Sequence, residues 1–273
     1  MIDLHSHVLP CLDDGPEALE GSLAIARVAT GEGIRTMVAT PHVSSRYPNR
    51  AATIHGRTAE LRERLDRDRI ELDVRAGAEV APSYLPKIDR AELGGLCLGD
   101  GPWLLLECPL QVDAPPLDEA VSSLQRQGLR VVLAHPERSP LFQRDPGALS
   151  ALVRSGALTS ITAAALSGRF GRQARRFSLE LVQSGLAHSV ASDCHDRYHR
   201  PPGMGRALSE TGLDALADWL THEVPGAIIA GTEIPRRPPG APGARKLGPR
   251  SWWRKARPAA SRAGTPGRGD ARR

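Results

Sequence analysis

The sequence has few cysteines and no long apolar run, and each shortage excludes a class of protein. Its four cysteines are far apart and form no C-x-x-C pair, which argues against a disulfide framework and a cysteine-rich zinc module. No stretch approaches the roughly 20 apolar residues that a membrane-spanning helix needs. The first seven residues contain neither a basic region nor an apolar run, so we expect no secretory signal and a reduced, cytoplasmic protein.

Acidic residues are almost missing from the C-terminal part of the chain. Residues 235–273 hold 12 of the 36 Lys and Arg residues and a single acid, Asp270, so this segment carries a charge of +11. The other 24 bases and 30 acids give residues 1–234 a charge of −6, which argues against a nucleic-acid partner. Residues 235–273 are rich in Pro, Gly, Arg and Ala. We therefore expect a folded domain over 1–234 and a disordered basic tail over 235–273.

Seven short runs of apolar or β-branched residues predict β-strands. They cover 2–5, 36–40, 72–76, 103–107, 130–134, 159–162 and 189–192. Several are apolar throughout, which is typical of strands buried on both faces of a parallel sheet. Helical periodicity lies between them, around 19–26, 117–124, 149–153 and 177–182, and a glycine follows three of these segments. Seven strand–helix repeats fit a parallel α/β sheet or a closed barrel.

Histidines and carboxylates follow six of the seven predicted strands. They are His5, His7, Asp14, His42, Glu79, Glu107, His135, Asp193 and His195. The carboxyl ends of parallel strands meet on one rim, where active sites form, so we expect these side chains to meet in space. A single histidine after a strand is ordinarily a cap or a loop residue. Five histidines and four acids together favour a cluster of divalent cations, because clustered carboxylates repel and buried imidazoles need partners.

The donor atoms indicate which cations suit this cluster. Imidazole nitrogen and carboxylate oxygen without thiolate suit manganese, iron or zinc. Nine candidate ligands exceed what one ion accepts, so we expect two or three ions, with Glu79 able to bridge two of them.

Five segments, in this order and spacing, resemble the PHP (polymerase and histidinol phosphatase) superfamily. They are residues 1–16, Ala39-Thr-Pro-His42, Gly77-Ala-Glu79, Ala134-His-Pro-Glu-Arg138 and Ala191-Ser-Asp-Cys-His195. The match covers about residues 1–234, and it is closest in kind to the bacterial manganese-dependent tyrosine-protein phosphatases linked to capsule and exopolysaccharide synthesis. The resemblance implies a distorted (β/α)7 barrel with a trinuclear metal centre.

The resemblance also implies a role for each candidate residue. The first ion would take His5, His7, Glu79 and Asp193, the second Glu79, Glu107 and His135, and the third Asp14, His42 and His195. Arg138 and Arg200 match the arginines that contact phosphate in the family. Two positions depart from the pattern: Cys11 stands where a glycine is usual, and Val43 stands where many members have a polar residue.

By this resemblance the chain is expected to hydrolyse phosphotyrosine on a bacterial tyrosine autokinase, or on a related protein of polysaccharide synthesis, with hydroxide activated by the metals. Two alternatives stay open: a phosphoesterase for a small molecule such as histidinol phosphate, and a non-catalytic binding protein. A third interpretation comes from Cys194 and Arg200, which fit the C-x5-R signature of cysteine-based phosphatases. Asp196 inside that loop would repel phosphate, and the loop has no glycine.

The basic tail raises the question of a second partner. Trp252 and Trp253 lie among basic residues, a combination that suits weak contact with an anionic membrane, at its inner face for a cytoplasmic protein. A solvated extension is the competing interpretation of the same segment. A homo-oligomer also stays open.

Overall fold

A ring of parallel strands forms the centre of the structure, a computed structural model that describes residues 1–239. One sheet has the order β1-β2-β4, with β1 at Ile2–Ser6, β2 at Thr36–Ala39 and β4 at Asp73–Ala76. The other has the order β3-β5-β6-β7-β8-β9. Its strands are β3 (His42–Val43), β5 (Glu79–Val80), β6 (Trp103–Glu107), β7 (Arg130–Ala134), β8 (Leu158–Thr162) and β9 (Ser189–Ala191). Every pairing between these strands is parallel.

Two strands pass from one sheet into the other and so join them. β2 leads into β3 across Thr40 and Pro41, and β4 leads into β5 across Gly77 and Ala78. Proline cannot donate to a strand ladder, which explains the first break. At Gly77 a Cβ atom would lie 2.9 Å from Val38 Cγ1, so only glycine lets the second crossing pack this closely. With each interrupted pair counted once, the ring has the seven strand positions that the sequence predicts.

The first and last strands close the ring. His7 N donates to Cys194 O at 2.8 Å, and Asp193 N donates to His5 O at 2.8 Å. Just below, Asp3 Oδ1 accepts from Ser192 N at 3.0 Å, and Ser192 Oγ donates to Asp3 Oδ2 at 2.5 Å. The predicted parallel α/β barrel is therefore confirmed, in the distorted form that the resemblance implies.

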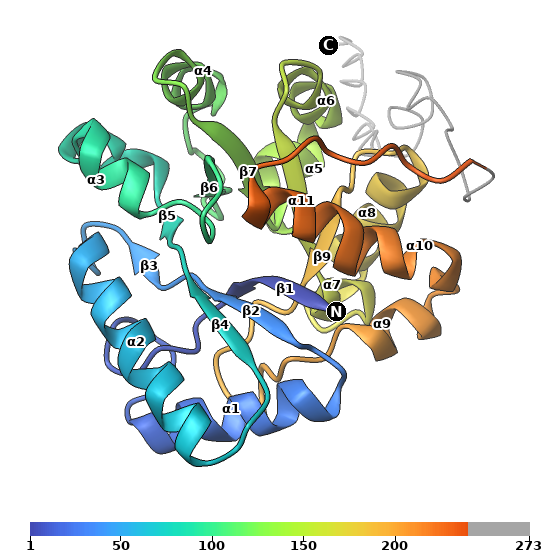
Figure 1. The fold of residues 1–273 in the computed structure, drawn as a ribbon. Helices are drawn as coiled ribbons and strands as arrows, with labels where there is room; N and C mark the ends of the chain where they lie inside the picture. Colours follow the sequence, from blue (N-terminus) through green and yellow to red (C-terminus); the bar gives the residue numbers. More distant parts are fainter. Residues whose placement is uncertain (240–273) are drawn as a thin grey trace, which may run out of the picture.

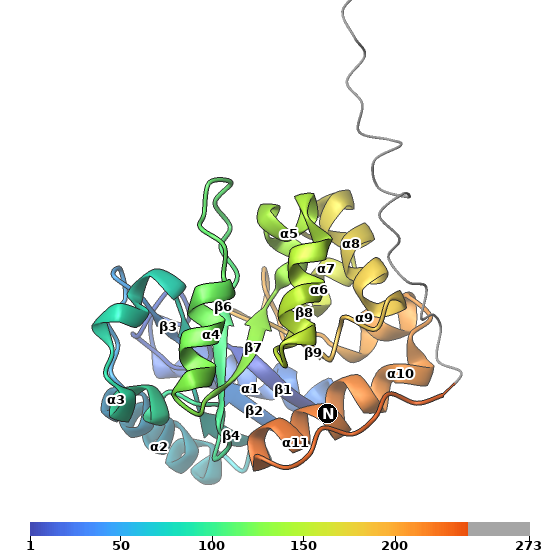
Figure 2. The ribbon, with the colours of Figure 1, turned by 90° about the horizontal axis from the view of Figure 1, so that it is seen from above.

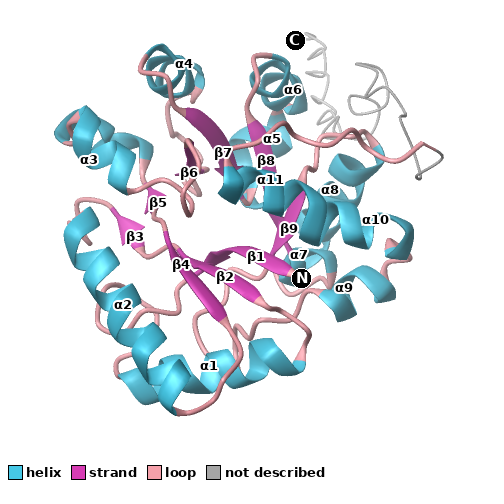
Figure 3. Ribbon diagram, in the orientation of Figure 1, coloured by secondary structure: helices cyan, strands magenta, loops and turns pink. Residues whose placement is uncertain are grey.

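Helices surround the strands, as Figures 1 and 3 show. They are α1 (Leu19–Gly31), α2 (Ala51–Arg67), α3 (Arg90–Gly95), α4 (Asp118–Arg126), α5 (Pro140–Arg144), α6 (Pro146–Arg154), α7 (Ala163–Leu166), α8 (Gly171–Gln183), α9 (Gly205–Glu210), α10 (Asp214–Asp218) and α11 (Val224–Ala230). Short helical turns lie at η1 (Pro82–Lys87), η2 (Pro136–Arg138) and η3 (Trp219–Glu223). The four predicted helical segments are confirmed as α1, α4, α6 and α8. Each buries an apolar stripe, such as Phe177 and Leu181 of α8, in the hydrophobic core.

Two segments outside this framework bear on function. The loop between β6 and α4 projects away from the barrel (Figure 2). After α11, the chain packs back on the body: Trp219 Nε1 donates to Pro235 O at 3.1 Å and Arg237 Nη1 donates to Val182 O at 2.8 Å. The rest of the predicted disordered tail, 240–273, lies outside the described residues. Over 1–239, the structure has no helix with the length and apolar character needed to cross a membrane.

Candidate metal centre

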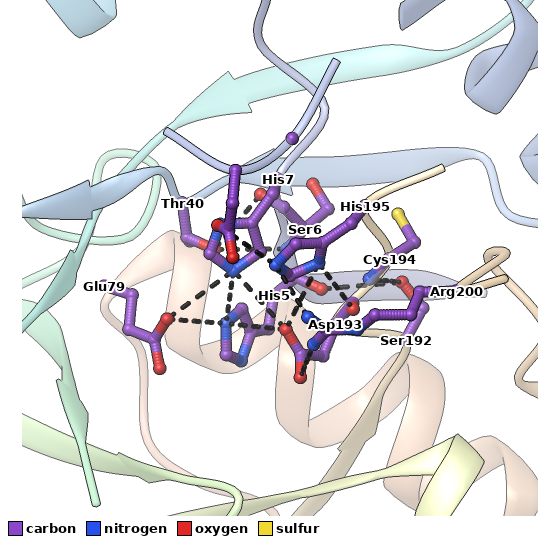
Figure 4. A network of polar contacts seen from close by, with 12 residues as sticks. His5, Ser6, His7, Thr40, Glu79, Ser192, Asp193, Cys194, His195 and Arg200 are labelled. Carbon is purple, nitrogen blue, oxygen red and sulfur yellow. Dashed lines mark hydrogen bonds and ion pairs between the residues drawn. The ribbon is translucent and has the colours of Figure 1, made fainter. Parts of the chain in front are cut away.

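The nine predicted ligands lie close together at the carboxyl ends of the strands, although they come from six different strand positions. Figure 4 shows five of them, His5, His7, Glu79, Asp193 and His195. Their donor atoms fall into four overlapping groups: His7, Asp14, His42 and His195; His5, His7 and Asp193; His5, Glu79 and His135; and His42, Glu79 and Glu107. Within each group the donor atoms lie within 4.8 Å of one another. We call His5, His7, Glu79, His135 and Asp193, which are each at most 3% exposed, the floor. We call Asp14, His42 and His195, which are each at least 7% exposed, the rim, and the half-buried Glu107 belongs to neither group.

Four atoms of the floor form a cage of the right size for one ion. They are His5 Nε2, His7 Nε2, Glu79 Oε2 and Asp193 Oδ1, and five of the distances between them range from 3.2 to 3.5 Å. Adjacent ligand atoms about 2.0–2.2 Å from one ion lie roughly 3–3.6 Å apart. The floor residues therefore fit a bound divalent cation without rearrangement.

Glu79 lies at the centre of the cluster, where a bridging carboxylate would be expected. Its Oε1 is 2.7 Å from His135 Nε2, and its Oε2 is 3.0 Å from His42 Nδ1. Oε2 is buried, and the imidazole nitrogens around it, on His42, His5 and His7, lie 3.0–3.5 Å away without hydrogen-bond geometry. An ionised oxygen left in this way is costly. Burial and the neighbouring charge of Glu79 raise the pKa of Glu107 to about 7. A cation between these two carboxylates would satisfy the first and relieve the second.

The carboxylates and imidazoles of the floor shift one another's pKa values. Burial disfavours the charge on Glu79, but the surrounding imidazoles of His5 and His135 outweigh it and hold the pKa of Glu79 well below its usual value. Burial likewise opposes protonation of His7, yet the carboxylates of Asp13, Asp193 and Glu79 raise its pKa. Protons and metal ions compete for such nitrogens, so the site should bind cations less tightly as the pH falls.

The rim is more open and less completely arranged. Asp14 Oδ1 lies 3.3 Å from His195 Nε2 and 3.6 Å from His42 Nε2, and the Asp14 side chain is 49% exposed. Arg200 Nη1 donates to the same His195 nitrogen at 2.8 Å. A cation held by Asp14, His42 and His195 would therefore compete with Arg200 for this atom.

Both predicted phosphate-contacting arginines lie beside the floor and contact one of its carboxylates. Arg138 Nη1 donates to Asp193 Oδ2 at 2.7 Å, and Arg200 Nη2 donates to the same oxygen at 2.5 Å. Asp193 thus has its Oδ1 toward the histidines and its Oδ2 toward the guanidinium groups. The Arg138 guanidinium also lies 4.2 Å from the centre of the Phe170 ring, which holds it in place by a cation–π contact.

Unusual backbone conformations place two of these ligands. His135 has a φ of 38° and Asp193 a φ of 53°, in the left-handed region that costs energy for residues other than glycine. Each follows the end of a strand, where the turn directs the side chain into the cluster. Cys11 has a φ of 61°, also in the left-handed region that favours glycine, the residue that the resemblance implies at this position.

Two supporting residues have no counterpart among the sequence predictions. Asp13 Oδ2 lies 2.6 Å from His7 Nδ1 and accepts from His42 N at 2.9 Å, which leaves His7 Nε2 facing the floor. Asn49 Nδ2 donates to Leu12 O at 2.7 Å and His42 O at 2.8 Å, so it joins the loops that carry Asp14 and His42. The only signal for Asp13 in the sequence is its place beside Asp14.

Cys194 is poorly suited to be a nucleophile. It is fully buried, and burial together with the nearby Asp3 raises the pKa of its thiol. A cysteine phosphatase needs an exposed thiolate, so the structure disfavours the C-x5-R interpretation.

Comparison with known proteins assigns the chain to a family. Residues 1–215 match the family model described as capsular polysaccharide synthesis, CpsB/CapC. The chain belongs to this family. It is 34% identical over 252 residues to tyrosine-protein phosphatase YwqE of Bacillus subtilis, covering 90% of this chain and 98% of the relative. It is 28% identical to tyrosine-protein phosphatase CpsB of Streptococcus pneumoniae, covering 76% of this chain and 88% of the relative.

A solved structure agrees with this assignment. It belongs to a study of YwqE from Bacillus subtilis and CpsB from Streptococcus pneumoniae, described there as unique metal-dependent tyrosine phosphatases. The match has a TM-score of 0.78 at 34% identity and covers 89% of this CpsB/CapC-family chain and 99% of the other. A lactonase from Listeria monocytogenes, at 14% identity and a TM-score of 0.51, shares the fold alone.

Proposed function

We propose that this CpsB/CapC-family protein is a metal-dependent protein-tyrosine phosphatase. The observation that carries the proposal is the arrangement around Asp193, which has one oxygen among the floor histidines and the other on Arg138 and Arg200. This arrangement puts a cation site and two phosphate-binding groups side by side. The named relatives, which are tyrosine-protein phosphatases, support the same activity for this chain.

The proposed ligands are those inferred from the sequence. One ion would take His5, His7, Glu79 and Asp193, a second Glu79, Glu107 and His135, and a third Asp14, His42 and His195. Manganese is the proposed metal, because nitrogen and oxygen donors suit it and the resemblance implies it; iron and zinc suit the same donors. Divalent cations in this cluster would supply hydroxide at neutral pH by lowering the pKa of water from 15.7 to about 7.

The residues of the chain bind and orient the phosphoryl group. A guanidinium has five N–H donors, and the contact with Asp193 uses one of those of Arg138, so the others are available to phosphoryl oxygens. Two planar guanidinium groups beside the ions neutralise charge that builds up on those oxygens. The tyrosyl oxygen leaves as a phenolate, which is a good leaving group, so we assign no general acid.

The decisive experiment combines a metal analysis with a substrate panel. The purified full-length protein is assayed with a phosphotyrosine peptide, a phosphoserine peptide and histidinol phosphate, before and after treatment with a chelator and after return of manganese, iron or zinc. We expect bound divalent metal, a preference for the phosphotyrosine peptide, loss of activity with chelator and best recovery with manganese. A preference for histidinol phosphate, or full activity in the chelator, would contradict the proposal.

The proposed biological substrate is a phosphotyrosine protein of polysaccharide synthesis, with a tyrosine autokinase as the partner. We place the encounter in the cytoplasm, at the inner face of the membrane. The basic tail offers either weak contact with anionic lipids or a solvated extension. Flotation with anionic vesicles at low and high salt separates the two, if full-length protein is compared with a chain ending at residue 239, which keeps the contacts of Pro235 and Arg237. Flotation of the full-length protein alone, lost at high salt, would support membrane contact.

A further inference from the structure

The mouth of the metal centre has a basic arc on one side. This basic arc consists of the loop between α7 and α8, residues 167–170, and the first part of the loop after His195, residues 196–200. Arg169 Nη1 donates to His199 O at 2.7 Å, which ties the two loops together. Phe170, next in the chain, contacts Arg138, and Arg200, next to His199, contacts Asp193. Arg169 is therefore next in the chain to Phe170, which contacts Arg138, and it is hydrogen-bonded to His199, the residue before Arg200.

The charges of this arc are not neutralised within the body. Neither Arg169 nor Arg197 has a carboxylate within 4.0 Å among the described residues. Arg197 lies over the ring of Tyr198 at 4.4 Å, so its charge is held in place without being cancelled. The acid in this segment, Asp196, accepts hydrogen bonds from the backbone N–H groups of 198, 199 and 200. Arg169 and Arg197 outnumber Asp196, so the arc carries a net positive charge although residues 1–234 carry an excess of acids.

One exposed apolar side chain, Tyr198, belongs to the arc itself, beside Arg197. Among the described residues, the most exposed large hydrophobic side chains are those of Leu110, Val112 and Tyr198, whose exposed fractions are 41, 56 and 66%. All three lie in loops that follow candidate ligands, the first two after Glu107 and the third after His195. An exposed aromatic ring beside an unpaired charge, as at Tyr198 and Arg197, is typical of a surface that binds a polypeptide.

We propose that this mouth, with Arg169, Arg197 and Tyr198, docks a polypeptide segment that carries acidic side chains next to the phosphotyrosine. The proposal rests on the proposed phosphatase activity and adds a preference for the sequence around the target residue. Unpaired guanidinium groups attract carboxylates, and the Tyr198 ring packs against the backbone or an apolar side chain of the segment. A small-molecule phosphate would reach the floor without touching the arc.

Three phosphotyrosine peptides of equal length test the docking surface, with flanking positions filled by Glu, Gln or Lys. The metal-loaded full-length protein is assayed on each, and kcat/KM for the Glu peptide is divided by that for the Gln peptide. This ratio cancels any general loss of activity in a variant. We expect a ratio of about 5 for the wild type, because each exposed ion pair contributes up to about fivefold in affinity. The ratio should fall at high salt, which screens exposed charges.

Variants of Arg197 assign the preference to the arc. Arg197→Gln should lower the ratio at least about twofold, and Arg197→Glu should bring it below 1 and favour the Lys peptide. Arg154→Gln is the matched control, because Arg154, the last residue of α6, is also exposed and within residues 1–239 bonds only to Ser150 Oγ. Binding of a non-hydrolysable phosphotyrosine analogue in the same three peptide contexts, followed by fluorescence anisotropy, should show the same order.

Four outcomes would overturn the docking proposal. They are a wild-type ratio near 1, equal ratios in Arg197→Gln and Arg154→Gln, a ratio that salt does not change, and a loss of binding to anionic vesicles in Arg197→Gln with no change in the peptide ratio. The last would assign the arc to a membrane. Failure of the phosphatase proposal would be different, because none of the three peptides would then be hydrolysed while histidinol phosphate is.

Discussion

The floor and the rim of the metal centre use the same side-chain types but are held in place differently. The floor residues lie at or next to the ends of buried strands, and His5, His7, Glu79 and Asp193 are each at most 2% exposed. The rim depends on Asp14, a half-exposed loop residue, and on His195, whose Nε2 accepts a hydrogen bond from Arg200. The strand ladder fixes the first set. In the second set, His42 is held by Asp13, which accepts from its backbone N, and by Asn49, which donates to its backbone O and to Leu12 O.

This difference indicates that one cluster can bind cations with unequal affinities and exchange rates. An ion on the floor meets four donors already at the right spacing, so little conformational entropy is lost when it binds. An ion on the rim must order an exposed loop and displace an arginine. We therefore expect a tightly held floor ion and a rim ion that exchanges with the solvent. The predictions below test this contrast.

The largest effect should come from the floor. His7→Ala removes a donor atom of the four-atom cage, and we expect a loss of at least about 100-fold in kcat/KM on a phosphotyrosine peptide, together with loss of bound metal. Assay with metal analysis measures both. The matched rim variant is Asp14→Asn, which should lose less activity and recover at higher manganese concentration. Equal losses in the two variants would remove the distinction between floor and rim.

The arginines should separate catalysis from metal binding. Arg138→Ala and Arg200→Ala should each lose about 100-fold in activity while keeping the floor metal, because a guanidinium cannot ligate a cation. Arg200→Ala also frees His195 Nε2, so it should bind the rim ion more tightly than wild type. Metal content measured over a range of manganese concentrations tests this. Loss of floor metal in either variant would show that the arginines act by holding Asp193.

Asp13 connects the two regions and should give a moderate effect. It contacts His7 of the floor and the backbone of His42 of the rim. Asp13→Asn weakens the partner of the His7 Nδ1 atom, and variants of this kind cost about 10–100-fold in metal affinity. Activity should return with excess manganese. Asp68→Asn, which alters only surface contacts with Arg27 and Arg64, is the control. An unchanged manganese requirement would show that the strand alone orients His7.

The smallest effect should come from a histidine with no carboxylate beside it. Burial and Arg237 lower the pKa of His188 to about 4, and its Nδ1 accepts from Thr159 N at 3.2 Å. The folded state therefore binds fewer protons than the unfolded state below pH 6.5, so the free energy of unfolding falls as the pH drops toward 4. After allowance for partial exposure the loss is about 2 kcal/mol.

Denaturant unfolding at pH 7 and pH 4.5 measures the His188 contribution. In His188→Asn the amide oxygen can still accept from Thr159 N, but the side chain cannot titrate. The difference in unfolding free energy between the two pH values should therefore be smaller in the variant than in the wild type. An identical pH dependence would show that the ring is protonated in the folded protein.

Much of this architecture could be predicted from the sequence because its signals are local. The apolar runs locate all seven strand positions, and the order of ligands along the chain follows the order of strands. The helix α2 was not predicted, because its buried Ile54, Leu61 and Leu65 are spread among many charged residues. The interruptions at Pro41 and Gly77 were also not predicted, although both residues are ones that weaken strand ladders.

The supporting contacts of the site could not be predicted for a different reason. Asn49 joins Leu12 to His42, over 37 and 7 residues of sequence, through one amide group. No periodicity or composition reports such a bond, because it depends on how two loops meet in space. The same holds for Asp193, whose two oxygens face different partners. The assignment of ions to ligands stays a prediction that metal analysis of the variants will test.

Closure of the ring by its first and last strands has a consequence for how the protein is made. His5 and His7 are synthesised before their partner Asp193, which follows 186 residues after His7. At about 5–20 residues per second, roughly 10–40 s pass before the two ends can meet. During this interval the nascent chain cannot form the four-atom cage. We therefore expect metal loading to follow translation, and a chain released before residue 195 to leave no half-active enzyme behind.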